Sequence, residues 1–234
     1  MSGFDAWIHA MTTLSTGGYS THDASFGYFQ SPALEWAATI FMLAGAVPFV
    51  LFIRLIYRGE FAFHKDVQVK ALFLLLILLT GIMSVHIFFG HDYSHWKSIT
   101  RSAFHLVSII TTTGYAAEDY LQWGGFAAVV FLFVTYLGAC AGSTSGGIKM
   151  MRLIISMQAL RAQFFRLIHP HGMVTLKYQG KRVDISVVQG VLGFLCLYVV
   201  ANTVLTIALA LTGLDFATAL SGAATAMANV GPGI

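Results

Sequence analysis

The segment Thr111-Thr-Thr-Gly-Tyr-Ala116 has two related segments elsewhere in the sequence, and the three can be aligned with one another. A related segment, Ser15-Thr-Gly-Gly-Tyr-Ser20, lies 96 residues earlier, and Ala228-Asn-Val-Gly-Pro-Gly233 lies 117 residues later. Each follows a short apolar stretch of helical character, at residues 5–14, 101–110 and 218–227. A single glycine turn is a weak signal, but three in register, aligned on one glycine each, indicate an internal repeat.

The composition is that of a membrane protein. Among the 234 residues, 57% are hydrophobic and only 10% are charged, and the mean hydropathy is +0.75. A water-soluble domain carries about a quarter of charged residues, so a soluble enzyme, a disordered chain and a nucleic-acid-binding module are excluded. The net charge of +3 is too small to predict a polyanionic partner.

The lengths of the uncharged segments predict an all-α polytopic membrane protein. Residues 36–53, 71–91, 121–148 and 185–214 each reach the length of about 18 residues that spans a bilayer as a helix. We expect Pro48 to kink the first of them. Residues 6–22, 102–117 and 216–234 are shorter and run into Thr, Ser, Asn and Gly. These three are predicted to enter the membrane as half-helices and to return as extended chain.

The charges sort by side when the spanning segments alternate and the short segments all enter from one face. Two basic residues, Lys97 and Arg101, then share that face with seven of the ten acids. The other eleven basic residues fall on the opposite face, which the positive-inside rule makes cytoplasmic: Arg54, Arg58, Lys65, Lys70, Lys149, Arg152, Arg161, Arg166, Lys177, Lys181 and Arg182. The three glycine turns are therefore predicted to open toward the outside.

A repeated half-helix and glycine turn favours ion conduction. A cation inside a bilayer needs its hydration shell replaced, and rings of backbone carbonyl oxygens can do this. Backbone bent to aim carbonyls at one axis requires glycine, and the half-helix directs its partially negative end at the same place. Only one glycine is common to the three turns, which predicts a filter less rigid and less selective than one with glycine at every second position.

These turns resemble degenerate versions of the potassium-channel filter TVGYG. Together with Gly138-Ala-Cys-Ala-Gly-Ser-Thr-Ser-Gly-Gly-Ile-Lys149, they make the whole chain similar to the Trk/Ktr/HKT superfamily of potassium uptake proteins, most of all to the bacterial TrkH/TrkG pore subunits. The resemblance implies repeats of helix, pore loop and helix around a pseudo-four-fold ion pore. It assigns the second repeat from its pore loop onward to residues 1–57, the third to 67–168 and the fourth, without its final helix, to 184–234.

The resemblance also implies site residues and partners. K⁺ is the transported ion, no cofactor is covalently bound, and no enzymatic reaction is implied. The expected partners are a second copy in a homodimer, a cytoplasmic nucleotide-binding regulatory subunit of the TrkA or KtrA type, and the lipid of the bacterial inner membrane. The filter residues are Ser15, Thr16, Gly17, Gly18, Thr111, Thr112, Thr113, Gly114, Asn229, Val230 and Gly231.

A glycine-rich break interrupts the third spanning segment. Four glycines with Ser and Thr make a poor helix interior, and irregular backbone at that depth must be buried in protein or line a watery cavity. By resemblance it is a gating loop below the filter, whereas close helix packing by small residues is the alternative. The loop residues are Gly138, Ala139, Cys140, Ala141, Gly142, Ser143, Thr144, Ser145, Gly146, Gly147 and the following Lys149.

Several polar residues allow two interpretations. His9 and His105 fit packing or hydrogen bonding behind the filter better than a metal or proton site, and His86, His91 and His95 fit a wet outer loop better than a metal site. Tyr19 and Tyr115 either brace the filter or anchor at the interface. Glu118 and Asp119 either concentrate cations at the mouth or belong to a solvated loop.

The main departure from the family pattern is the number of turns, because a four-fold pore needs four and three are present. We therefore expect the sequence to be a fragment of a longer chain, and assembly with a second polypeptide is the alternative. Two other function classes remain: a secondary transporter with broken helices, whose repeats would usually be inverted, and a membrane enzyme using the outer histidines.

Overall fold

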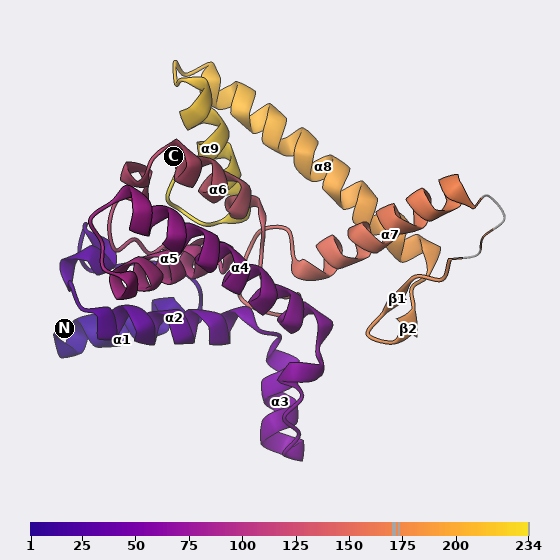
Figure 1. Cartoon of the computed structure of the whole chain (residues 1–234), viewed down its shortest axis with the longest axis horizontal. Helices are drawn as coiled ribbons and strands as arrows, with labels where there is room; N and C mark the ends of the chain where they lie inside the picture. The colour runs from indigo at the N-terminus through magenta and orange to yellow at the C-terminus, as the bar shows by residue number, and fades with distance from the viewer. Residues whose placement is uncertain (170–171, 173, 234) are drawn as a thin grey trace.

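The protein is almost entirely helical (Figure 1). The structure, a computed structural model, describes residues 1–169, 172 and 174–233. The described elements are α1 (Gly3–Leu14), η1 (Ser25–Tyr28), α2 (Pro32–Ala46), α3 (Phe49–Arg58), η2 (Phe63–Lys65), α4 (Val67–Gly90), α5 (His95–Ile110), η3 (Tyr120–Trp123), α6 (Gly125–Tyr136), α7 (Met150–Ile168), β1 (Lys177–Tyr178), β2 (Lys181–Arg182), α8 (Ile185–Ala210) and α9 (Phe216–Ala228). The predicted all-α polytopic fold is confirmed, with one small antiparallel hairpin, β1–β2, added.

Fewer continuous spanning helices are present than the four that the sequence predicts. Within the described residues, α4 and α8 are long and apolar enough to cross a membrane, and α2 with α3 makes a third candidate bent by 88°. The kink expected at Pro48 is therefore present, as a sharp bend between α2 and α3. Val47, which precedes the proline, is extended, as the proline ring demands, and the chain changes direction there.

The segment 121–148 was wrongly predicted as one span with an internal break. Its helical part, α6, has only 12 residues and ends at Tyr136. The chain then forms an irregular stretch, which we call the Gly-rich loop (residues 137–149), before α7 begins at Met150. The break that the glycines predict is thus a complete interruption, because so many glycines and hydroxyl side chains cannot sustain a helix.

The three half-helices begin earlier than the apolar pattern indicates, because polar residues cap them. At α1, Ser2 and Asp5 form a capping box, and the Ser94 hydroxyl accepts from the Lys97 amide at the start of α5. The Asp215 carboxylate accepts from two amides of α9. Side-chain oxygens at these positions satisfy amides that the first turn leaves free. The half-helix predicted from the sequence began at Arg101, whereas α5 starts six residues before it.

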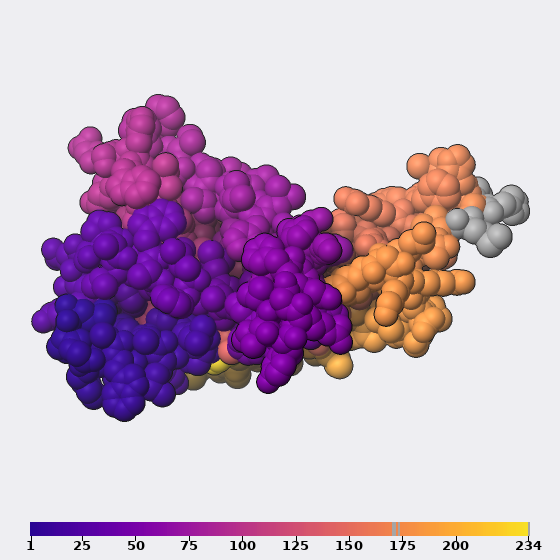
Figure 2. Space-filling view, turned by 90° about the horizontal axis from the view of Figure 1, so that it is seen from below, coloured from indigo at the N-terminus to yellow at the C-terminus, as the bar shows by residue number. Residues whose placement is uncertain are grey.

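Two hydrophobic clusters hold the molecule together. The larger joins α2, α4, α5 and α6 around fully buried residues such as Met42, Leu72 and Phe131. The smaller joins α7 and α8 through Ile155, Val188 and Val191. Figure 2 shows α7, the hairpin and the beginning of α8 extending away from the packed body. Of the half-helices, α5 and the end of α9 contribute residues to the larger cluster, as does the Gly-rich loop through Ala139 and Cys140.

Phe131 tests that cluster. Its side chain is 0% exposed and lies against Tyr120 and Trp123, with ring centroids 4.5 and 5.9 Å away. We expect Phe131→Ala to lower the free energy of unfolding by about 3–5 kcal/mol, because it leaves a cavity. Phe133→Ala, on the same helix but 66% exposed, is the matched control. Thermal unfolding in detergent measures both, and equal losses would contradict this assignment of the core.

Candidate functional site

The three glycine turns share one backbone conformation. We call them turn 1 (residues 15–19), turn 2 (residues 111–115) and turn 3 (residues 228–232). In each turn, two residues with one residue between them have a left-handed backbone conformation. Their positions in the three turns differ by the same offsets of 96 and 117 residues that align the sequence. The φ values are 52° at Thr16, 69° at Gly18, 57° at Thr112, 83° at Gly114, 61° at Asn229 and 104° at Gly231.

The amides of the turns point back to the half-helix that precedes each of them. Gly17 and Gly18 both donate to the Thr12 carbonyl, at 2.8 and 3.4 Å. Thr113 and Gly114 donate to Ser108 at 2.8 and 3.2 Å, and Val230 donates to Thr225 at 3.0 Å. In a trans peptide the N–H and C=O groups point in opposite directions. The carbonyl oxygens of these peptides are therefore directed away from the half-helices.

Neighbouring turns lie in backbone contact. A Cβ added at Gly18 would collide with the Thr113 carbonyl, and one added at Gly114 would collide with the Val230 carbonyl. Turn 1 thus packs on turn 2, and turn 2 packs on turn 3. The Thr113 and Val230 carbonyls approach Gly18 and Gly114 of the adjacent repeats, so these two glycines are required both by their positive φ and by the close approach.

His9 and His105 occupy equivalent places behind turns 1 and 2. His9 Nδ1 lies 2.7 Å from the Asp5 carbonyl and its Nε2 lies 3.1 Å from Ser20 Oγ. His105 Nδ1 lies 2.8 Å from the Arg101 carbonyl, and its Nε2 accepts from the Ala117 amide at 3.2 Å. A carbonyl only accepts, so Nδ1 carries a proton in both. The imidazoles thus hydrogen-bond the chain that leaves each turn.

Tyr115 braces turn 2 against α1, the half-helix of the previous repeat. Its side chain is 1% exposed, and its hydroxyl lies 2.5 Å from Thr12 Oγ1 and 3.1 Å from Thr13 Oγ1. Tyr19, the equivalent residue of turn 1, is 74% exposed. The two tyrosines, which the sequence treats alike, therefore differ, and only Tyr115 forms a brace within the described residues.

The Gly-rich loop touches all three turns. Thr16 Oγ1 donates to Thr144 Oγ1 at 3.0 Å, and the Gly146 amide donates to Thr112 Oγ1 at 2.6 Å. A Cβ at Gly146 would collide with the Ala228 carbonyl. The loop therefore meets each turn at its beginning, where the half-helix ends.

The same loop is anchored to the helices around it. Cys140 and Thr144 donate through their amides to the carbonyls of Ala46 and Gly45, both at 3.2 Å. The Ala141 amide donates to Gln68 Oε1 at 2.7 Å. Lys149 folds back so that its ammonium group donates to the Ser145 carbonyl. The ammonium thus stabilises the loop itself, and this contact was not foreseen in the sequence.

Sequence reasoning also missed an ionic cluster behind turn 2. Arg101 Nη1 lies 3.2 Å from Glu35 Oε1, and Arg101 Nε lies 3.4 Å from Glu118 Oε2. Tyr93 and Trp123 donate to the other Glu118 oxygen at 3.2 and 3.1 Å. Burial and the Glu118 carboxylate raise the pKa of Tyr93, so this hydroxyl remains a donor. The available signal was Arg101, a charge directly before the uncharged residues 102–117.

The remaining titratable groups do not assemble into a metal centre. Within residues 1–169, 172 and 174–233, no cluster of three His, Cys, Asp or Glu side chains is placed to hold a metal ion. Of the three outer histidines, His86 instead contacts the Trp123 carbonyl through Nε2 at 3.0 Å. Of the two acids after turn 2, Asp119 is exposed and caps η3, whereas Glu118 is engaged by Arg101.

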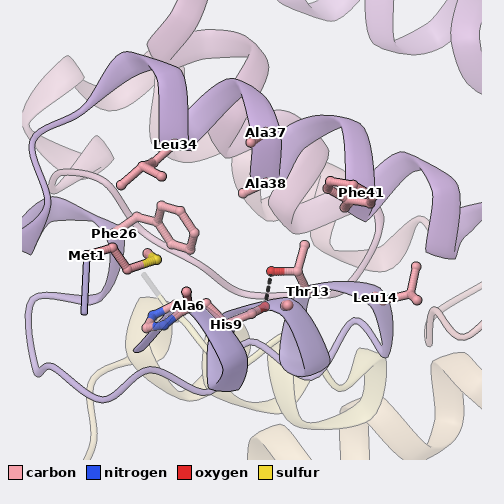
Figure 3. Close-up of a pocket in the computed structure, with 11 residues that line it drawn as sticks. Met1, Ala6, His9, Thr13, Leu14, Phe26, Leu34, Ala37, Ala38 and Phe41 are labelled. Carbon is pink, nitrogen blue, oxygen red and sulfur yellow. Dashed lines mark hydrogen bonds between the residues drawn. The ribbon is translucent and has the colours of Figure 1, made fainter. Parts of the chain in front are cut away.

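A hollow of about 280 Å³ lies between α1 and α2, on the side of α1 away from turn 2 (Figure 3). Phe26, Leu34 and Phe41 line it, and no charged side chain does. Figure 3 shows the His9 ring facing Phe26 across it, and Thr13 turned to the His9 carbonyl. Such an apolar lining does not suit a cation, so the turns and the Gly-rich loop are the candidate ion site.

Gly114 tests the packing of the turns. Gly59 has a similar φ of 64°, but a Cβ there would have nothing within 4 Å. We expect Gly59→Ala to cost only the left-handed backbone penalty of about 1–2 kcal/mol. Gly114→Ala adds the collision with Val230 and should lower the thermal midpoint clearly further. Equal midpoints for the two purified variants would contradict the contact between turns 2 and 3.

Known proteins share this architecture. A family model described as cation transport protein, TrkH, matches residues 1–234. The chain is 45% identical over 236 residues to the Trk system potassium uptake protein TrkI of Halomonas elongata, covering 100% of this chain and 48% of that protein. It is 35% identical over 239 residues to TrkH of Vibrio parahaemolyticus, covering 100% of this chain and 49% of that protein.

A solved structure agrees with the fold. The crystal structure of the potassium transporter TrkH from Vibrio parahaemolyticus matches with a TM-score of 0.93 and 36% identity, over 100% of this chain and 51% of that one. The chain thus spans about half the length of the relatives that it matches. The family model covers every residue, and the fold agrees along the whole chain, so this protein belongs to the TrkH family of cation transport proteins.

Proposed function

We propose that the chain lines the pore of a Trk-type potassium uptake protein. The chain comprises the second unit from its pore loop onward (residues 1–57), the third unit of helix, pore loop and broken helix (67–168), and the fourth unit up to its filter (184–234); the last residue, Ile234, lies outside the described part of the chain. The residues of turns 1 to 3 form the selectivity filter. The function is passage of dehydrated K⁺, with no chemical reaction and no covalently bound cofactor.

The observation that carries this proposal is the direction of the turn carbonyls. Their amides are bonded to Thr12, Ser108 and Thr225, which leaves the oxygens free to face the space between the turns. K⁺ binds to backbone carbonyls that replace its hydration shell. The relatives named above are potassium uptake proteins, in agreement with K⁺ as the transported ion.

We further propose that the Gly-rich loop gates the pore. Its bonds to Thr16 and Thr112 place it against the inner ends of the turns, where an ion leaving the filter would pass. Small side chains let the loop move aside without displacing bulky groups. The Lys149 ammonium holds the loop in its present shape through Ser145.

The distribution of charge supports a location and an orientation. The eleven basic residues assigned to the cytoplasm lie on α3, η2, the beginning of α4, the Gly-rich loop, α7 and the hairpin. In Figure 1 the start of α1 lies at the left, whereas α7 and the hairpin lie at the right and α3 projects below the middle. We propose a bacterial inner-membrane protein with this basic face in the cytoplasm, assembled as a homodimer and regulated there by a nucleotide-binding subunit.

Potassium uptake is tested by complementation. We expect a chain of the relatives' length that contains these residues to restore growth of uptake-deficient bacteria at low external K⁺. Gly114→Ala should abolish growth because it displaces turn 2, whereas Gly59→Ala should not. Radioactive Rb⁺ uptake and membrane content are measured together. A correctly inserted protein that restores no uptake would refute the proposed function.

The gate is tested by deleting residues 143–145 in the same chain. The deletion removes the Thr144 bonds to Thr16 and Gly45, so basal Rb⁺ flux should rise several-fold. Thr144→Val should give a smaller rise. Thr135→Val is the matched control, since its hydroxyl bonds only the carbonyl of Phe131 in its own helix. Unchanged flux in the deletion variant would reject the gate.

A further inference from the structure

We propose that Glu35, Arg101 and Glu118 form a strut that positions turn 2 and thereby sets its preference among cations. This inference rests on the proposed pore function and adds positioning residues to it. The strut joins three parts of the chain: Glu35 lies in the first turn of α2, Arg101 lies in the half-helix α5, and Glu118 lies three residues after turn 2.

Burial makes the strut rigid. The side chains of Glu35, Arg101 and Glu118 are 1%, 15% and 21% exposed. Burying a carboxylate without a partner costs free energy. The ion pair between Glu35 and Arg101 therefore fixes both side chains. The guanidinium has a fixed planar fork, and its two nitrogens reach the two carboxylates from one position. Glu118 is thereby fixed relative to α2 as well as α5.

The main chain around Glu118 is fixed by further contacts. The Ala116 and Ala117 amides donate to Ser25 Oγ and His105 Nε2, at 3.3 and 3.2 Å. The Gly27 amide donates to the Ala116 carbonyl at 3.2 Å. Every residue from Ala116 to Glu118 therefore has a partner outside the turn, on η1, α5 or the strut.

Turn 2 needs such external support. Its sequence carries one glycine, and Thr112 holds a left-handed φ of 57°, a conformation that costs a β-branched residue free energy. The turn keeps this shape because its two ends are held, the first by Ser108 and the second by the segment that Glu118 anchors. Carbonyl positions discriminate among ions by cavity size and field strength, so a looser turn admits Na⁺ more readily.

The strut differs from a surface charge at the pore mouth. A mouth charge acts through its field, so Glu118→Gln and Asp119→Asn would lower apparent K⁺ affinity alike, and more so at low ionic strength. A strut acts by fixing positions, through the ion pairs of Arg101 and through the hydrogen bonds that Tyr93 and Trp123 donate to Glu118. Tyr93→Phe and Trp123→Phe each remove a donor to Glu118 and leave every charge in place. These two substitutions therefore separate the two roles.

The experiment measures K⁺, Rb⁺ and Na⁺ uptake by the relatives'-length chain in uptake-deficient cells. We expect Arg101→Gln and Glu118→Gln to lower the K⁺:Na⁺ uptake ratio about tenfold, and Tyr93→Phe and Trp123→Phe to lower it by a smaller factor. Arg101→Lys, which keeps a positive charge between the two carboxylates, should retain part of the ratio. Asp92→Asn, at an exposed outer carboxylate, is the matched control and should leave the ratio unchanged.

Four outcomes decide the matter. A lowered ratio in the four variants, with thermal midpoints of the two aromatic variants near that of the parent, supports the strut. An unchanged ratio in a parent that transports K⁺ overturns the strut and leaves the pore intact. Equal losses of K⁺ affinity in Glu118→Gln and Asp119→Asn, with the ratio preserved, make Glu118 a mouth charge. A parent that transports no K⁺ refutes the pore function itself.

Discussion

The backbone amides of the turns must be hydrogen-bonded within the protein, and this requirement shapes the structure. Water is scarce at bilayer depth, so each N–H must find an acceptor inside the protein. In all three turns the acceptor is a carbonyl in the last turn of the half-helix: Thr12, Ser108 or Thr225. Because a trans peptide directs its oxygen opposite to its N–H, meeting this requirement also turns the carbonyls to the space between the repeats. The same hydrogen bonds therefore stabilise the turn and direct the carbonyls that are proposed to bind K⁺.

The Gly-rich loop obeys the same requirement with different partners. Its first amide, at Gly138, donates to Ile148 at 2.7 Å, and the Ile148 amide donates to Tyr136 at 3.0 Å. The two ends of the loop are thus hydrogen-bonded to each other and form an isolated β-bridge between Leu137 and Ile148. Its middle depends on neighbouring helices and on hydroxyls of turns 1 and 2. The loop lacks helical hydrogen bonding and most of its side chains are small, which fits the proposed gate.

The sequence predicted some elements well and others poorly, for physical reasons. The register of the turns could be predicted because a left-handed backbone selects glycine or asparagine at fixed positions. The 88° bend after α2 could not, since Pro48 requires a break but does not determine its angle. The early start of α5 was missed because Ser94 caps it ahead of the apolar pattern. The ion pair of Glu118 could not be predicted, because Arg101 is 17 residues away and Glu35, the other partner of Arg101, is 83 residues away.

The sequence by itself determined the membrane class, the three repeats, the break at 138–147 and the family resemblance. Each depends on composition, or on residue types at set spacings, which local chemistry fixes. Only the tertiary structure decided which side chains meet: Thr144 with Thr16, Gln68 with the loop, and Arg101 with two carboxylates from distant segments. Such contacts depend on how the half-helices pack side by side, and spacing along the chain carries no record of that packing.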